Sequence, residues 1–303
     1  MRRKFLAATM AIALLTTATA DAARYFNQGD AIGSATPYGD NITVGEYARA
    51  GDANIYYEVY GRGEPILILH GGGVGTPYEL GKILDELVQN HRLIVMSTRG
   101  HGRSEIGHSP LTLKQKADDA LAVLDALNIS EPVQILGFSD GAYAAYEIAA
   151  LYPARVERIT AIGAGTLTAG YFPAEIDFAA LERADEKFFA EQKKIRPEPE
   201  RWSEFMSDYM KFWNGQSIGA ETLSAIKCPV LLIVGDEDDH APVITVLAAH
   251  QLIANSRLCV VPKAWHTAFA DNFDVTSTAI RQFVDAPLQS LTPSKKVDLN
   301  SNR

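Results

Sequence analysis

Short apolar runs alternate with segments of helical spacing along most of the chain. The runs that predict strands lie at residues 54–60, 65–69, 93–96, 133–136, 155–162, 229–234 and 257–261. Apolar residues three and four positions apart predict helices at 78–89, 112–127, 141–151, 242–254 and 268–284. This alternation is typical of an α/β domain, in which a mostly parallel twisted sheet carries helices on both faces.

Residues 167–225 interrupt this alternation because they contain no strand pattern. Trp202, Phe205, Tyr209 and Phe212 are spaced so that their rings follow one face of a helix. We therefore expect a small helical cap inserted into the core. The aromatic face either packs onto the core or lines the mouth of a pocket, so Trp202, Phe205 and Tyr209 are candidate substrate-binding residues.

The two ends of the chain differ in composition from the rest. Residues 1–20 combine a basic start, a short apolar stretch and an Ala-Thr-Ala cleavage site. This pattern predicts a signal peptide and export to the periplasm or beyond, by the Sec or the twin-arginine route. The apolar stretch is too short to span a bilayer, so no stable membrane anchor is expected. Residues 286–303 are polar and are predicted to be disordered, which leaves 21–166 and 226–285 as the core.

Composition limits the partners of the protein. Lysine and arginine number 28 against 37 aspartates and glutamates, a net charge of −9 without a basic stripe. Such a surface repels phosphate backbones, which argues against nucleic acid and for a small-molecule substrate. The two cysteines, Cys228 and Cys259, are staggered on neighbouring predicted strands, so we expect free, buried thiols and no structural zinc site.

Candidate chemistry begins with Gly137-Phe138-Ser139-Asp140-Gly141, which matches G-x-S-x-G between a predicted strand and a predicted helix. The chain must reverse there within a few residues, and the two glycines lack the Cβ atoms that would clash. The Ser139 hydroxyl is then held out at the end of the strand. The backbone N–H of Asp140 opens the helix and points to the same place. The motif therefore predicts Ser139 as a nucleophile.

At this motif the sequence resembles the α/β-hydrolase superfamily, and the resemblance covers residues 47–284. The loop 70–73, with the sequence His-Gly-Gly-Gly, is similar to the oxyanion loop of serine esterases in that family. The resemblance implies an eight-stranded sheet and an oxyanion hole formed by the backbone N–H groups of Gly72 and Asp140. A plain glycine turn is the alternative explanation of the loop.

A serine hydroxyl is a weak nucleophile and requires a base within hydrogen-bond reach. His266 lies just past the last predicted strand, on a loop that leads into the final predicted helix. The resemblance places the catalytic histidine at this position. His240 is the reserve candidate, although its position in the sequence is too close to the acidic loop to bridge to Ser139.

Four acids follow the penultimate predicted strand, at residues 236–239. The family pattern Gly-x-x-Asp, followed shortly by a proline, selects Asp238 as the acid that holds the imidazole in one tautomer. Asp236, Glu237 and Asp239 remain the alternatives, as solvated acids of the loop. The chain order Ser, Asp, His is that of the family.

These residues predict a serine hydrolase that cleaves a small carboxylic ester or a related acyl bond through an acyl-enzyme, with no metal and no organic cofactor. Lipases, aminopeptidases and carbon–carbon bond hydrolases use the same groups, so the motif does not separate them from an esterase. Dehalogenases and epoxide hydrolases use an aspartate where this chain has Ser139. A ligand receptor with a vestigial triad is the alternative from a different class.

Overall fold

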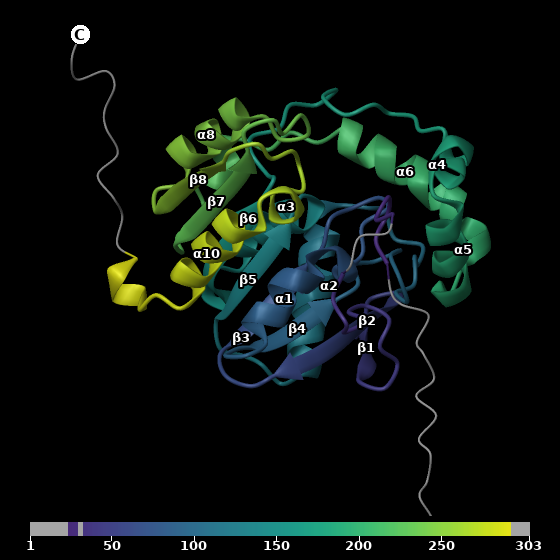
Figure 1. Cartoon of the computed structure of the whole chain (residues 1–303), viewed down its shortest axis with the longest axis horizontal. Coiled ribbons are helices and arrows are strands. Elements are labelled where there is room, and N and C mark those ends of the chain that lie inside the picture. Colours follow the sequence, from purple (N-terminus) through teal and green to yellow (C-terminus); the bar gives the residue numbers. More distant parts are fainter. Residues whose placement is uncertain (1–23, 30–32, 292–303) are drawn as a thin grey trace, which may run out of the picture.

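The centre of the molecule is an eight-stranded sheet, seen in a computed structural model that describes residues 24–29 and 33–291 (Figure 1). Its strands are β1 (Gly45–Ala50), β2 (Ala53–Gly61), β3 (Pro65–Leu69), β4 (Arg92–Met96), β5 (Val133–Phe138), β6 (Val156–Ile162), β7 (Val230–Gly235) and β8 (Ser256–Val261). Their order across the sheet is β1-β2-β4-β3-β5-β6-β7-β8. Strand β2 runs antiparallel to β1 and β4, and all other neighbours are parallel. The predicted mostly parallel sheet is confirmed.

Helices cover both faces of this sheet, which is why β5 and β7 are buried along their whole length. The core helices are α1 (Gly81–Leu87), α2 (Leu113–Ala126), α3 (Asp140–Leu151), α8 (Val243–Leu252), α9 (Ala268–Asp271) and α10 (Phe273–Val284), with 3-10 turns η1 (Pro77–Leu80), η2 (Pro153–Arg155) and η4 (Leu288–Ser290). One apolar cluster joins α2, α3 and α8 to one face, and a second joins α1, α9 and α10 to the other. Across the described residues, no helix has the length and apolar character needed to cross a membrane.

The insertion forms a separate group of helices beside the ends of the central strands (Figure 1). It contains α4 (Phe178–Ala184), α5 (Glu186–Ile195), η3 (Pro199–Arg201) and α6 (Trp202–Asn214), and it is followed by α7 (Ala220–Leu223), which packs against the core helices α3 and α8. Its two ends meet, because Leu167 N–H donates to Ile218 O at 2.9 Å and Ile218 N–H donates back at 2.8 Å. The cap therefore leaves the core and returns to it at one place.

Two elements differ from the sequence prediction. The single helix predicted at 268–284 is two helices, α9 and α10, because Asn272 between them has a φ of −140° that no helix accommodates. Strand β1 has no apolar run that predicts it. It is an edge strand in which only Ala48 and Ala50 are buried. A half-exposed edge strand lacks the continuous apolar run that marks the central strands.

The predicted disorder of residues 286–303 is wrong for the first six of them. The chain forms η4 there, and Leu291 is 1% exposed. Its carbonyl accepts a hydrogen bond from Asn255 Nδ2 at 2.8 Å, which ties this segment to the start of β8. Residues 292–303 lie outside the described residues, as does the predicted signal peptide at 1–20.

Both cysteines are free, but the prediction that they are buried is wrong, because each is half-buried. Cys259 is in register with Ile233 in the middle of β7, whereas Cys228 precedes that strand. This stagger keeps the two thiols apart, and burial raises the pKa of Cys228 to about 12. Cys228 therefore stays protonated near neutral pH, and a thiol in this state is a poor nucleophile.

Candidate active site

Ser139 occupies a strained turn between β5 and α3. Its φ of 50° and ψ of −115° lie in a region that residues other than glycine rarely adopt. The turn is held because Ser139 N–H donates to Ile162 O at 2.8 Å and Ala142 N–H donates to Ser139 O at 2.9 Å. A Cβ on Gly137 would lie 2.5 Å from the carbonyl oxygen of Gly141, so this close approach requires glycine. The sequence motif and the backbone geometry therefore agree.

The loop after β8 brings His266 to Ser139 from 127 residues further along the chain. His266 Nε2 lies 2.9 Å from Ser139 Oγ. The imidazole packs against Phe138, with ring centroids 4.9 Å apart, and its side chain is 17% exposed. Packing of this kind limits the rotation of the ring and keeps Nε2 directed at the hydroxyl.

Asp238 lies on the other side of the imidazole. Its two carboxylate oxygens are 2.9 and 3.0 Å from His266 Nδ1, and Oδ1 also accepts hydrogen bonds from the N–H groups of His240 and Ala241 at 2.9 and 2.8 Å. Burial raises the pKa of Asp238, but the hydrogen bond and charge of His266 and these backbone donors outweigh burial and lower it. The carboxylate is therefore ionised near neutral pH. An Nδ1–H bonded to it leaves Nε2 free to accept the serine proton.

The other acids of this loop are turned elsewhere. Asp236 accepts a hydrogen bond from Ala264 N–H at 3.2 Å, Glu237 is exposed, and Asp239 is exposed and pairs with His240 Nδ1 at 2.8 Å. Only Asp238 among the four contacts the imidazole of the loop after β8. The reserve base, His240, has its Nδ1 bonded to Asp239, whereas the hydrogen bond to Ser139 Oγ comes from His266.

The buried side chain of His70 anchors the glycine-rich loop 70–73 through hydrogen bonds. His70 Nδ1–H donates to Gly71 O, and His70 Nε2 accepts from Thr98 N–H at 3.0 Å. Burial lowers the pKa of His70 to about 4, so the ring stays neutral and keeps both bonds near neutral pH. Glu79 Oε1 accepts from Gly71 N–H at 2.6 Å on the other side of the loop. The loop is a fixed element and not a loose turn.

Gly72 and Asp140 both line the cavity at Ser139. Asp140 is the first residue of α3, and the first N–H groups of a helix have no acceptor within the helix. A Cβ on Gly72 would overlap the hydroxyl oxygen of Tyr209, so a larger residue there would have to displace that side chain. The two residues predicted to form an oxyanion hole therefore lie on the cavity wall beside Ser139, and the role of their N–H groups stays a prediction.

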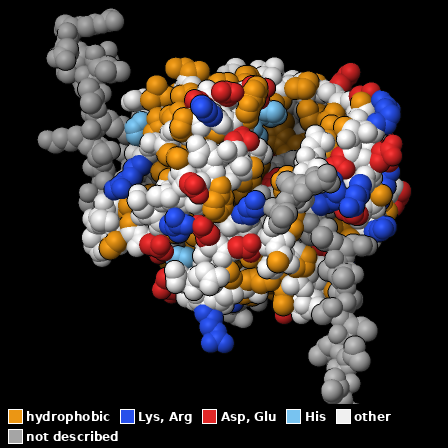
Figure 2. Space-filling view, in the orientation of Figure 1, with side chains coloured by type: hydrophobic (Ala, Val, Ile, Leu, Met, Phe, Trp, Pro, Cys, Tyr) orange, Lys and Arg blue, Asp and Glu red, His pale blue; other side chains and the backbone are white. Residues whose placement is uncertain are grey.

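A cavity of about 300 Å³ opens beside Ser139, between the core and the cap. Figure 2 shows a recess with hydrophobic walls at this boundary. Apart from Ser139, Asp140 and His240, the lining consists of glycine, apolar and aromatic residues: Gly72, Gly73, Val74, Tyr143, Phe172, Pro173, Ile176, Leu181, Met206, Tyr209, Met210 and Trp213. A cavity of this size and character fits a small apolar acyl or aryl group.

Of the three predicted substrate-binding rings, only Tyr209 lies on this cavity. Trp202 is fully buried within the cap and stacks on Phe189, with ring centroids 4.6 Å apart. Phe205 packs against His101 with ring centroids 5.5 Å apart. Both predictions are corrected: these two rings hold the cap together and attach it to the core.

Sequence reasoning missed three other residues of α6 that line the cavity, Met206, Met210 and Trp213. They share one helical face with Tyr209, because they are spaced three and four positions apart. The same helix carries the pattern that indicates these residues. The spacing of the aromatic rings alone, however, selects a helical face that is rotated toward the interior of the cap. Methionine adapts to irregular apolar surfaces and is well suited to such a wall.

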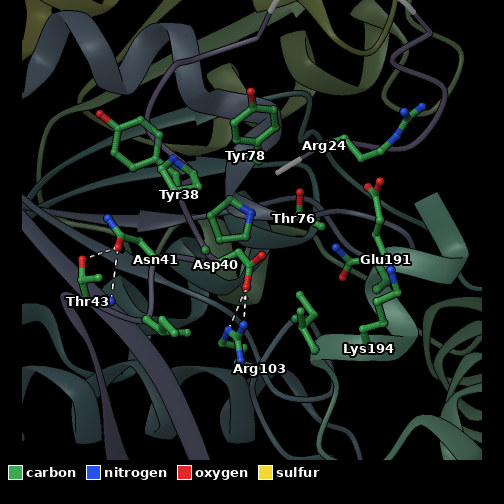
Figure 3. A pocket seen from close by; sticks show the side chains of 17 residues that line it. Arg24, Tyr38, Asp40, Asn41, Thr43, Thr76, Tyr78, Arg103, Glu191 and Lys194 are labelled. Carbon is green, nitrogen blue, oxygen red and sulfur yellow. Dashed lines mark hydrogen bonds and ion pairs between the residues drawn. The ribbon is translucent and has the colours of Figure 1, made fainter. Parts of the chain in front are cut away.

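A second, larger cavity of about 390 Å³ lies between the N-terminal segment, the loop before η1 and α5 (Figure 3). Polar groups surround it, among them Arg103, which pairs with Asp40 at 2.5 Å. Ser139, Asp238 and His266 are not part of its wall. Size alone therefore does not mark the candidate site, and the smaller cavity is the one that borders Ser139.

One group of possible metal ligands occurs among the described residues, namely Asp238, His240 and His266, whose ligand atoms lie within 4.8 Å of one another. Both nitrogens of His266 already face partners, Asp238 and Ser139. A metal ion bound here would have to displace those hydrogen bonds.

Comparison with known proteins agrees with this geometry. A family model described as "alpha/beta hydrolase fold" matches residues 64–195. "Putative carbamate hydrolase RutD" of Azorhizobium caulinodans is 26% identical over 259 residues, which covers 78% of this chain and 97% of that protein. "Serine hydrolase BPHL" of Homo sapiens is 24% identical over 261 residues, which covers 80% of this chain and 87% of that protein.

Solved structures show the same fold at low sequence identity. A hydrolase from Pseudomonas aeruginosa PA01 superimposes with a TM-score of 0.68 at 22% identity, covering 81% of this chain and all of the other. The chain therefore has the α/β-hydrolase fold, and it is an enzyme of the hydrolase class.

Proposed function

We propose that the protein is a serine esterase in which Ser139 is the nucleophile, His266 the general base and then the general acid, and Asp238 the group that orients the imidazole. The observation that carries this proposal is the continuous chain of contacts from Asp238 through His266 to Ser139 Oγ, each between 2.9 and 3.0 Å. These are hydrogen-bond distances, and they end at a hydroxyl held on a strained turn.

In the first half of the reaction, Ser139 Oγ attacks the carbonyl carbon while its proton moves to His266 Nε2. The carbonyl oxygen becomes negatively charged, and the backbone N–H groups of Gly72 and Asp140 donate hydrogen bonds to it. The intermediate then collapses, and the protonated His266 donates its proton to the departing alcohol oxygen. The products of this half are the free alcohol and an acyl group bound to Ser139.

In the second half, water attacks the acyl carbon while His266 accepts a proton from it. The oxyanion forms and collapses again, Ser139 Oγ leaves with a proton from His266, and the carboxylic acid is released. Asp238 does not exchange protons in either half; its negative charge stabilises the imidazolium that forms in each. The lowered pKa of Asp238 supports this role, because the group must be ionised to fill it.

The apolar cavity supports a small, uncharged acyl or aryl substrate. Most of its lining offers van der Waals contact and few hydrogen bonds, which is unsuited to a sugar or a long peptide. The names of the two relatives, "Putative carbamate hydrolase RutD" and "Serine hydrolase BPHL", agree with cleavage at a carbonyl carbon.

The test is hydrolysis of p-nitrophenyl esters from acetate to dodecanoate by the purified protein, by Ser139→Ala and by the control Ser224→Ala. Wild type and Ser224→Ala, whose serine is exposed and distant in sequence from the turn, are expected to cleave the short esters. Ser139→Ala should show no turnover above background. Hydrolysis that survives in Ser139→Ala would contradict the proposal.

We also propose that residues 1–20 direct export and are removed on the way. The basic start, the short apolar stretch and the Ala-Thr-Ala site support this. Expression of the full chain in a bacterial host should yield periplasmic or secreted protein that begins at Asp21, as read by N-terminal sequencing. Cytosolic protein that keeps residues 1–20 would contradict it.

A further inference from the structure

The residue that follows the proposed nucleophile carries a negative charge at the site. Asp140 opens α3, its side chain is 3% exposed, and it forms part of the cavity wall together with Ser139 and Gly72. In the proposed reaction the backbone N–H of this residue stabilises a developing oxyanion. A carboxylate on the same residue opposes that charge, since like charges at short range in a buried site repel strongly.

The ammonium group of Lys116, on α2, pairs with this carboxylate. Its Nζ lies 2.8 Å from Asp140 Oδ2, and the Lys116 side chain is 4% exposed. The other carboxylate oxygen, Oδ1, is buried without a hydrogen-bond partner among the described residues. Lys116 is therefore the cation that pairs with Asp140 among the described residues, and the pair lies within the protein and not on its surface.

The cap encloses the same ammonium group. Lys116 Nζ lies 5.4 Å from the ring centroid of Tyr209 and 5.9 Å from that of Phe212, both on α6. Aromatic faces attract a cation at these distances, which helps to hold it without water. The charge of Asp140 also acts on the cap. The pKa of Tyr209 is raised well above its ordinary value, first by burial and second by the negative charge of Asp140. Core and cap thus meet around one lysine.

We propose that Lys116 is a positioning residue of the hydrolase site, which cancels the charge of Asp140 and fixes the first turn of α3 so that its N–H can stabilise the oxyanion. The inference rests on the proposed function, because it assigns a role relative to the oxyanion formed at Ser139. It predicts an asymmetry between the two partners. A carboxylate left without Lys116 opposes catalysis, whereas a lysine left without the carboxylate does not.

A purely structural ion pair makes a different prediction. Removing either partner would then leave one unpaired buried charge, so both single variants would lose stability to a similar degree. Their effects on kcat would also be similar, since neither charge would act on the reacting atoms. The ratio of the two kcat values therefore separates the two roles, whatever the change in stability.

The experiment compares Lys116→Met, Asp140→Asn and the double variant with wild type, using kcat and KM for a short aryl ester. Lys116→Met should lower kcat about 100-fold with KM changed less than about threefold, the size of effect expected when one oxyanion contact is lost. Asp140→Asn should keep a kcat at least tenfold above that of Lys116→Met. The double variant should recover to within about tenfold of wild type, because it lacks the opposing charge.

Lys114→Met is the matched control, because Lys114 lies on the same helix, is exposed and pairs with Asp118 at 2.6 Å. Its kcat should equal that of wild type. If Lys116→Met does not fold, Lys116→Gln provides the same comparison with a polar neutral side chain. Equal losses of kcat in the Lys116 and Asp140 single variants, or a folded Lys116 variant within threefold of wild type, would overturn the inference.

Failure of this inference and failure of the proposed function have different signatures. A fluorophosphonate probe that does not label wild type at Ser139 contradicts the proposed function, whatever the Lys116 variants do. Labelling of wild type together with unchanged kcat in Lys116→Met contradicts the role of Lys116 alone.

Discussion

The imidazole of His240 lies nearly parallel to that of His266, with ring centroids 4.6 Å apart and planes at 21°. Of these stacked rings, His266 contacts Ser139, because its Nε2 lies 2.9 Å from Ser139 Oγ, while Nδ1 of His240 bonds to Asp239. The two histidines are thus neighbours in space with separate hydrogen-bond partners. Substitution of each in turn tests which of them is the base.

His266→Ala should lower kcat by about four to six orders of magnitude, as expected when the general base of a serine hydrolase is removed. His240→Ala should cost no more than about tenfold, because its ring supports His266 and borders the cavity without contacting the hydroxyl. Steady-state kinetics with a short aryl ester measures both. A larger loss in His240→Ala than in His266→Ala would show that the base has been misassigned.

Asp238→Asn should lower kcat by about 10⁴-fold, since an amide cannot hold the imidazole in the tautomer that accepts the serine proton. The variant keeps the size of the side chain, so circular dichroism should show a folded protein. Asp239→Asn is the control, because that carboxylate is exposed and does not contact His266. If Asp239→Asn proved the more damaging of the two, the choice among the four acids of this loop would be wrong.

Glu79 gives the protein a dependence of stability on pH. Burial raises the pKa of this carboxyl to about 8, although the hydrogen bond from Gly71 N–H lowers it in part. Between an unfolded value of 4.5 and about 8, the folded state holds a proton that the unfolded state has lost, so stability falls as pH rises through this window.

Glu79→Gln should remove this dependence, because its amide does not titrate. Between pH 5 and pH 8, the free energy of unfolding of wild type should fall by on the order of 2 kcal/mol more than that of the variant. This figure is discounted for the partial exposure of the residue. Urea unfolding at the two pH values measures it. Glu64→Gln, on an exposed residue, is the control and should follow wild type. Parallel changes in wild type and Glu79→Gln would refute the effect.

Met210 offers a way to change the substrate range without disturbing the triad. It lines the cavity from α6 and is only half-buried, so its truncation should cost little stability. Met210→Ala should move the preferred acyl chain toward longer esters, and Met210→Trp should move it toward acetate. Asp208→Ala, exposed on the same helix, should leave the preference unchanged. An unchanged chain-length profile in both Met210 variants would exclude this cavity as the acyl site.

The central strands and the serine turn could be predicted from the sequence because each has a local signal. An apolar run such as Pro65–Leu69 is typical of a strand buried on both faces, and two glycines flanking Ser139 mark a reversal that larger residues would block. Asp238 and His266 carry no such local signal. Their selection depends on family resemblance, and the structure brings His266 to Ser139 and Asp238 to the other side of the His266 ring.

Other features depend on how distant segments meet. Lys116 looks like any lysine of an amphipathic helix, and nothing local distinguishes it from the exposed Lys114 two positions earlier. Its role arises only when α2 packs beside the first turn of α3. The same holds for Trp202. The sequence allows its ring to face either the core or the cavity, and the packing of α5 against α6 directs it into the cap.

Activation of Ser139 is tested by mass spectrometry of the protein after reaction with a fluorophosphonate, a probe that reacts preferentially with activated serines. One added probe per chain is expected, located on the peptide that contains Ser139. Labelling should be absent in Ser139→Ala and strongly slowed in His266→Ala. A probe found on another residue, or one that still attaches to Ser139→Ala, would contradict it.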